Sequence, residues 1–181
     1  LARQPRGVVE AAEAVAVFEA ANKADPPDYA LLAATRAYRD LGRFDDAARL
    51  ARQGERRFPD DGVWPLVLSL VLSDAGKTGE ALAVLKTPGA RQAPPVERLM
   101  AEGYAWRRAG NIASALSAYG EAIRLSGNNP GVRKEAAGVL LDAGAPYGAA
   151  MLAGAAVTQI TLVAQAPQSP AVAKEVADLM V

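Results

Sequence analysis

The sequence predicts an all-α protein, a right-handed superhelix of about five helix-turn-helix repeats. Glycines recur every 34 residues, at Gly42, Gly76, Gly110 and Gly144. Five residues after each glycine comes an alanine, at Ala47, Ala81, Ala115 and Ala149. Four residues before each glycine comes a large side chain, at Tyr38, Leu72, Trp106 and Leu140. A fixed period of this length indicates stacked repeat units and disfavours a single-core enzyme fold.

Each repeat contains the signals that begin and end two helices. The glycine ends the first helix in a left-handed conformation, and the alanine lets the second helix approach the first closely. Proline then stops the second helix, as at Pro59. An earlier partial copy contains Ala14, Phe18, Ala21 and Pro26. This spacing is the second-helix pattern of the tetratricopeptide repeat.

These signals predict ten helices and no strand. In chain order, the helices are expected near residues 9–23, 28–41, 45–57, 62–75, 79–86, 96–109, 113–125, 131–143, 147–164 and 169–180. The helix at 79–86 is short because Pro88 follows it, and the proline-rich stretch Lys86–Pro95 is expected to be a longer loop. We therefore divide the chain into a partial N-terminal repeat (1–27), a repeat array (28–164) and a C-terminal capping helix (165–181).

The C-terminal part of the array differs in charge from the rest. Residues 143–173 contain no charged side chain. The predicted helix 147–164 is nevertheless short and alanine-rich for a membrane span, so we expect a helix buried on several sides. Terminal repeats normally carry a polar capping face, which this helix cannot supply. We therefore expect self-association through residues 147–181.

Composition excludes several function classes. The chain has 20 basic and 20 acidic residues, so no net field favours nucleic acid or a membrane surface. It has no cysteine and no histidine, which excludes common zinc sites and thiol or imidazole catalysis. The sequence predicts no enzyme activity, no metal and no cofactor. Because the chain begins at Leu1 without a signal-peptide pattern, we expect a fragment of a longer protein.

If the first helices line a groove, as in tetratricopeptide arrays, the repeat frame assigns its residues. The candidates for a ligand or partner groove are Tyr29, Arg36, Arg39, Asp40, Leu70, Asp74, Glu97, Tyr104, Arg107, Arg108, Lys134 and Asp142. Asp40, Asp74, Arg108 and Asp142 occupy one repeat position, two residues before each glycine, and we call them the aspartate column. A carboxylate at a helix C-terminus opposes the macrodipole. The column is therefore either a surface for a cationic or hydroxyl-rich ligand, or a set of solvated turn residues and local arginine–aspartate pairs, such as Arg39 with Asp40.

Four segments suggest a narrower family. They are YALLAATRAYRDLG (29–42), LSDAGKTGEALAVL (72–85), LMAEGYAWRRAG (99–110) and LLDAGAPYGAA (140–150). Together they resemble the periplasmic tetratricopeptide-repeat domain of poly-β-1,6-N-acetylglucosamine export porins of the PgaA type. The resemblance implies a non-catalytic scaffold on the periplasmic side of the bacterial outer membrane. It also implies a cationic, partly deacetylated exopolysaccharide or a periplasmic polysaccharide deacetylase as partner.

A second interpretation needs no such relative. In it, the chain is a general protein–protein adaptor, periplasmic or cytoplasmic, whose groove holds a peptide or a partner protein. The aspartate column favours the polymer, whereas apolar first-helix residues such as Leu32, Leu66 and Met100 favour a peptide. The sequence leaves both interpretations open.

Overall fold

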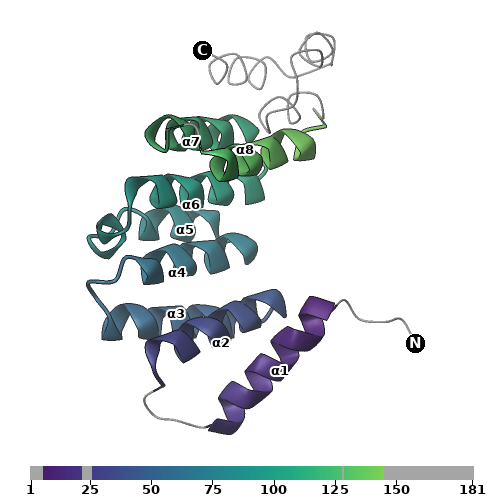
Figure 1. Ribbon diagram of the computed structural model, residues 1–181, viewed down its shortest axis with the longest axis vertical. Helices are drawn as coiled ribbons and strands as arrows, with labels where there is room; N and C mark the ends of the chain where they lie inside the picture. The colour runs from purple at the N-terminus through teal and green to yellow at the C-terminus, as the bar shows by residue number, and fades with distance from the viewer. Residues whose placement is uncertain (1–5, 22–25, 128, 145–181) are drawn as a thin grey trace. The chain divides into compact units, whose positions relative to one another are not determined.

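The structure is a computed structural model that describes residues 6–21, 26–127 and 129–144. Within these residues it is helical and contains no strand, as the sequence predicts. The α-helices are α1 (Arg6–Ala21), α2 (Asp28–Asp40), α3 (Phe44–Arg57), α4 (Val63–Asp74), α5 (Thr78–Val84), α6 (Pro95–Arg108), α7 (Ile112–Leu125) and α8 (Pro130–Asp142) (Figure 1). The two helices predicted at 147–164 and 169–180, and the self-association surface at 147–181, lie outside the described residues.

The helices belong to two compact units that divide after Ala93. In the first unit, α1 packs on α2, α2 on α3, α3 on α4, and α4 on α5. In the second unit, α6 packs on α7 and α7 on α8. Sequential helices are therefore spatial neighbours within each unit, which is the arrangement expected of helix-turn-helix repeats.

The repeat glycines end the first helices as predicted. Gly42, Gly76, Gly110 and Gly144 have φ values of 73°, 75°, 73° and 73°. After Gly42, the Arg43 amide donates to the Tyr38 carbonyl at 2.8 Å. The amide of Gly42 itself donates to the carbonyl of Arg39 at 2.9 Å. The same pair of hydrogen bonds recurs around Gly76 and Gly110, so each glycine forms a Schellman motif that turns the chain into the second helix.

The repeat alanines lie at the helix–helix contacts. Ala47, Ala81 and Ala115 have no exposed surface, and Ala149 lies outside the described residues. Of the four large residues before the glycines, Tyr38, Leu72 and Leu140 are buried. The fourth, Trp106, is partly buried against the core of the second unit. That core is formed by buried residues of α7 and α8.

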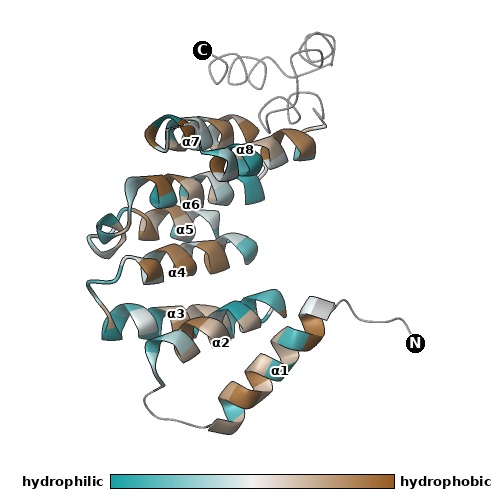
Figure 2. Ribbon diagram, viewed as in Figure 1, coloured by the Kyte–Doolittle hydropathy of each residue, from teal (hydrophilic) through white to brown (hydrophobic). Residues whose placement is uncertain are grey.

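Glycine allows an equally close contact between α3 and α4. A Cβ atom at Gly54 would lie 2.1 Å from the indole ring of Trp64, so only glycine accommodates this ring. Trp64 is fully buried, stacks on Phe58 and donates its Nε1 hydrogen to Asp28 Oδ1 at 3.1 Å. Figure 2 shows that α4 is mostly hydrophobic, whereas α3 is largely hydrophilic.

The loop after α5 differs in detail from the prediction. Within the expected loop Lys86–Pro95, residues Gly89–Gln92 form a 3-10 helix, η1, which packs on α4. Its Ala90 is fully buried. The second helix ends at Val84, shortly before Pro88 as expected, but the residues after the proline form a short helical turn that contacts α4.

Candidate functional site

The structure places all of the predicted groove residues on the first helices of their repeats. In the first unit, α2 carries Tyr29, Arg36, Arg39 and Asp40, and α4 carries Leu70 and Asp74. In the second unit, α6 carries Glu97, Tyr104, Arg107 and Arg108, and α8 carries Lys134 and Asp142. The candidate site is therefore two first-helix faces, one in each unit.

The first-helix face of the first unit exposes large apolar side chains at equivalent repeat positions. Tyr29 is 76% exposed on α2, and Val63, which is 34 residues later on α4, is 38% exposed. Leu70 is half-buried on α4, and Arg36 is exposed on α2. Single exposed apolar side chains are common on protein surfaces, so it is their recurrence at one repeat position that makes this face a candidate contact surface.

Two aspartates of the aspartate column bind arginines of the preceding repeat. Arg39 Nε donates to Asp74 Oδ2 at 2.5 Å, and Arg107 Nε donates to Asp142 Oδ2 at 2.6 Å. Each pair spans 35 residues and joins two successive first helices within one unit. Asp40, the first member of the column, is exposed at the end of α2. Asp74 and Asp142 thus contribute to packing between repeats.

Arg107 has room for this pairing because α8 has a glycine beneath it. A Cβ atom at Gly138 would lie 2.7 Å from an Nη atom of Arg107. The guanidinium also lies 3.9 Å from a carboxylate oxygen of Glu135. The hydrogen bond to Asp142 raises the pKa of Arg107. The other candidates of this unit are less buried: Glu97, Arg108 and Lys134 are exposed, and Tyr104 is half-buried.

The structure also contains a groove that the sequence does not predict. It lies between α1 and α2, reaches the start of α3 and has a volume of about 750 Å³. Ala14, Val17 and Phe18 of α1 line one side, and Ala30, Ala33 and Ala34 of α2 line the other. Of the predicted site residues, only Tyr29 contributes to this groove. No periodic signal marks it, because it depends on how α1 crosses α2.

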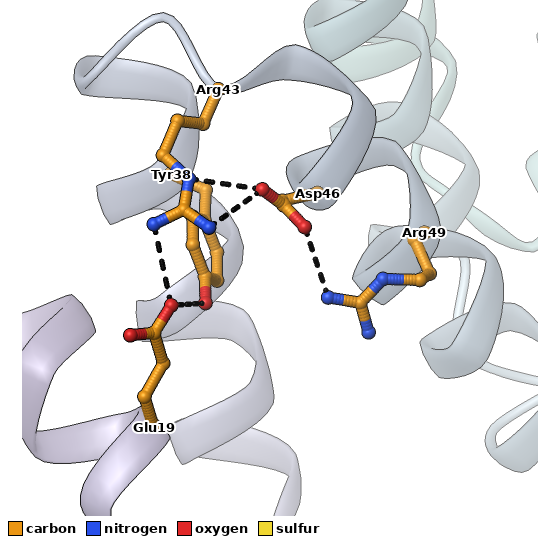
Figure 3. A network of polar contacts seen from close by, with 5 residues as sticks. All are labelled: Glu19, Tyr38, Arg43, Asp46 and Arg49. Carbon is orange, nitrogen blue, oxygen red and sulfur yellow. Dashed lines mark hydrogen bonds and ion pairs between the residues drawn. The ribbon is translucent and has the colours of Figure 1, made fainter.

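Five of the residues that line this groove form a polar network (Figure 3). Glu19 Oε1 accepts from the Tyr38 hydroxyl at 2.8 Å and from Arg43 Nη1 at 3.3 Å. Asp46 accepts from Arg43 Nε at 2.9 Å and from Arg49 Nη2 at 3.2 Å. The Arg43 guanidinium also lies 4.5 Å from the centroid of the Tyr38 ring. The network therefore connects α1, α2 and α3.

The pKa values of the network follow from these contacts. Burial, followed by the hydrogen bond to Glu19, raises the pKa of Tyr38. Hydrogen bonds from Arg49 and Arg43 lower the pKa of Asp46. At neutral pH the tyrosine is thus a neutral donor and the aspartate a charged acceptor, a combination that holds helices together and activates no nucleophile.

The described residues include no metal-binding cluster and no membrane-spanning helix. Among them, no group of three or more acidic, histidine or cysteine side chains is placed to hold a metal ion. In the part of the chain that the structure describes, no helix is both long and apolar enough to cross a membrane. The arrangement offers apolar contact, ion pairing and hydrogen bonding, which are the elements of a binding surface.

Comparison with known proteins identifies the fold. No protein-family model and no curated protein matches the chain. Among solved structures, TTC0263, a thermophilic TPR protein of Thermus thermophilus, matches with a TM-score of 0.62 and 21% identity over 96% of this chain and 93% of that one.

Two structures of MamA also match. MamA from MSR-1 has a TM-score of 0.52 and 21% identity, covering 88% of this chain and 93% of that one. MamA from AMB-1 has a TM-score of 0.54 and 20% identity, covering 88% of this chain and 94% of that one. At these identities the likeness concerns the fold alone. It confirms the predicted all-α fold of the tetratricopeptide-repeat type, and it does not test the resemblance to export porins.

Proposed function

We propose that this chain is a non-catalytic scaffold that binds a partner protein through the first-helix faces of its tetratricopeptide-type repeats. The observation that supports this most is the exposure of Tyr29 and Val63, one repeat apart on α2 and α4. Burying such side chains against a partner is favourable by ~25 cal/mol per Å² of apolar surface. Half-buried Leu70 and exposed Arg36 add an apolar contact and a charge to the same helices. An extended or helical peptide matches this combination.

Affinity capture with a matched control tests this proposal. Wild-type chain, a Tyr29→Ser/Val63→Ser variant and a Leu125→Ser variant serve as baits in an extract of the source organism, with quantification by mass spectrometry. Leu125 is 56% exposed on the second helix α7, so its replacement removes a similar apolar group from another surface. We expect a partner that is retained by wild type and by Leu125→Ser but lost by the double variant. Equal capture by all three baits would refute the first-helix surface.

A narrower proposal specifies the partner. In it, the chain is the periplasmic domain of an outer-membrane exopolysaccharide export porin. It guides partly deacetylated poly-N-acetylglucosamine or docks the periplasmic deacetylase. Its support is the resemblance of four segments between residues 29 and 150, together with the carboxylates of the aspartate column. The matches to solved repeat proteins concern the fold alone and give no support to polysaccharide binding. The broader adaptor role is therefore the better supported of the two.

Binding of glucosamine oligomers tests the narrower proposal. If the column attracts ammonium groups, Asp74→Asn with Asp142→Asn weakens binding of deacetylated oligomers and leaves binding of acetylated ones unchanged. Added salt should have the same effect, because it screens exposed charges. Asp74 and Asp142 also bind Arg39 and Arg107, so replacing them changes contacts between repeats as well. An Asp40→Asn variant makes the same kind of change at an exposed member of the column. Equal loss for both oligomers, or no loss for either in all variants, would reject the polymer proposal.

A further inference from the structure

The groove between α1 and α2 has apolar sides that remain open to solvent. Ala30, Ala33 and Ala34 are spaced three and four residues apart, so they form one face of α2. Val17 on the opposite side is 70% exposed. The volume of about 750 Å³ is comparable to that of ligand and peptide pockets. Short alanine side chains on one side leave space for a third element to approach the helix backbone.

The contacts of α1 differ from those of the inner helices. α3 packs on both α2 and α4, and α4 packs on both α3 and α5, whereas α1 packs mainly on α2. The groove therefore has two helical walls and an open third side. A helix, which is ~10 Å across with its side chains, can lie along both walls and bury their apolar residues.

The charges around the groove determine the chemistry of this helix. Four acidic side chains (Glu10, Glu13, Glu19, Asp46) and two basic ones (Arg43, Arg49) line the groove, an excess of two negative charges. Glu19 and Asp46 bind Arg43 and Arg49 in the polar network, so these four charges cancel. Glu10 and Glu13 have no such partner among the described residues, and both are exposed on α1. The uncompensated charge of the groove is therefore acidic and belongs to α1.

From these observations, we infer that the groove between α1 and α2 binds a basic amphipathic helix of a partner protein. Its apolar face fills the space between Val17 of α1 and Ala33 of α2. Its lysine or arginine side chains face Glu10 and Glu13. The site goes beyond the proposed function, because α1 supplies one of its walls and both of its uncompensated charges, and of the residues of the first-helix surface it includes only Tyr29. A binding protein of this kind has two docking surfaces.

The test uses two synthetic peptides and the full chain. One fluorescein-labelled peptide contains leucine, alanine and lysine in an amphipathic pattern of roughly 18 residues, long enough to form a helix. The second peptide is identical except that glutamate replaces every lysine. Fluorescence anisotropy is expected to show binding of the basic peptide and much weaker binding of the acidic one.

Variants of an exposed residue then locate the site. Val17→Lys should weaken binding of the basic peptide by about fivefold or more, because it adds a positive charge beside the groove. Val17→Glu should keep or strengthen that binding. Glu10→Gln with Glu13→Gln should weaken it, whereas Asp60→Asn with Glu121→Gln, which removes two exposed carboxylates elsewhere, should not. Thermal unfolding followed by circular dichroism confirms that each variant folds like the wild type.

Three results would overturn the proposal. If both peptides bind equally, the acidic charge of the groove has no role. If the Asp60/Glu121 control loses as much affinity as the Glu10/Glu13 variant, the attraction is diffuse. If sedimentation shows a dimer that Val17→Lys dissociates, the groove belongs to a second copy of the chain. The first-helix proposal is tested separately through Val63 on α4, which does not line the groove, whereas Tyr29 lines it and is left unchanged in every variant used here.

Discussion

Ala115 shows how one small side chain sets the distance between two helices. It is fully buried, and it shares the core of the second unit with Tyr119 and Leu140. A methyl group here lets α7 approach its neighbours, and a larger group has no space to enter. The sequence predicts this role from spacing alone, because the same residue type recurs five positions after each repeat glycine.

Enlarging this side chain should destabilise the protein. Ala115→Leu inserts three carbon atoms into a packed contact, which costs about 1–3 kcal/mol through overpacking. Urea denaturation followed by circular dichroism measures the change in unfolding free energy. Ser117→Leu, at an exposed position of the same helix, is the control and should change stability by less than about 0.5 kcal/mol. A neutral Ala115→Leu variant would show that the repeat frame is misassigned.

The arginine–aspartate pairs are the residue-scale feature that the sequence only partly predicts. The aspartate column stands out because it repeats, and one of its two interpretations includes local arginine–aspartate pairs such as Arg39 with Asp40. The actual partners are Arg39 for Asp74 and Arg107 for Asp142, each 35 residues apart. This separation is one residue more than the repeat, so a search within single repeats does not find it. Such pairs can be recognised in a sequence by two residues: an arginine directly before the column position of one repeat, and an aspartate at the column position of the next repeat.

At the scale of helices, the pairing of a first helix with its second helix depends on matched side-chain sizes. Gly103 of α6 lies against Tyr119 of α7, since a Cβ at Gly103 would come within 2.8 Å of the ring. The positions 34 residues before Gly103 and Tyr119 hold Ser69 and Leu85, and one further repeat back they hold Thr35 and Ala51. From Gly103 back to Ser69 and Thr35, the first-helix residue becomes larger. From Tyr119 back to Leu85 and Ala51, the second-helix residue becomes smaller. All of them are buried.

A double-mutant cycle tests this size matching. Gly103→Ala should destabilise the protein by about 1–3 kcal/mol, because the rigid Tyr119 ring cannot move away without loss of packing. With Tyr119→Leu, which reproduces the combination of a small residue with leucine at Ser69 and Leu85, the same change should cost clearly less. Unfolding free energies of the four proteins give the coupling energy. An additive cycle would show that the two side chains do not restrict each other.

Most helix boundaries could be predicted because the glycines that end the first helices recur at fixed repeat positions. The predicted 28–41, 45–57, 96–109 and 113–125 agree within two residues with α2, α3, α6 and α7. Glycines with positive φ end the first helices, and the second helices begin directly after them. α1 is less well predicted: it starts at Arg6, directly after Pro5, instead of at residue 9, so the proline was the signal that the prediction did not use. The 3-10 helix at Gly89–Gln92 was missed, since four residues between prolines leave no helical periodicity to detect.

At the scale of the whole molecule, the candidate site was less predictable than the fold. The repeat frame assigns residues to first helices correctly, because helix faces follow from spacing. It does not show that Asp74 has an intramolecular partner, nor that α1 and α2 enclose a groove. The partner of Asp74 lies 35 residues away, in the preceding repeat. The groove depends on contacts such as that of Glu19 with Tyr38, 19 residues apart, which the repeat spacing does not predict. Folds built from repeats are thus easier to predict than the surfaces they present.

The central claim is that this chain binds a protein partner through its first-helix faces, and hydroxyl-radical footprinting tests it most directly. Radicals oxidise exposed side chains, so oxidation of Tyr29 and Val63 reports their exposure, and Leu125 on α7 is an equally apolar reference. When the captured partner is added, oxidation of Tyr29 and Val63 is expected to fall while that of Leu125 stays unchanged. Protection of Leu125 with Tyr29 and Val63 still fully oxidised would contradict the account.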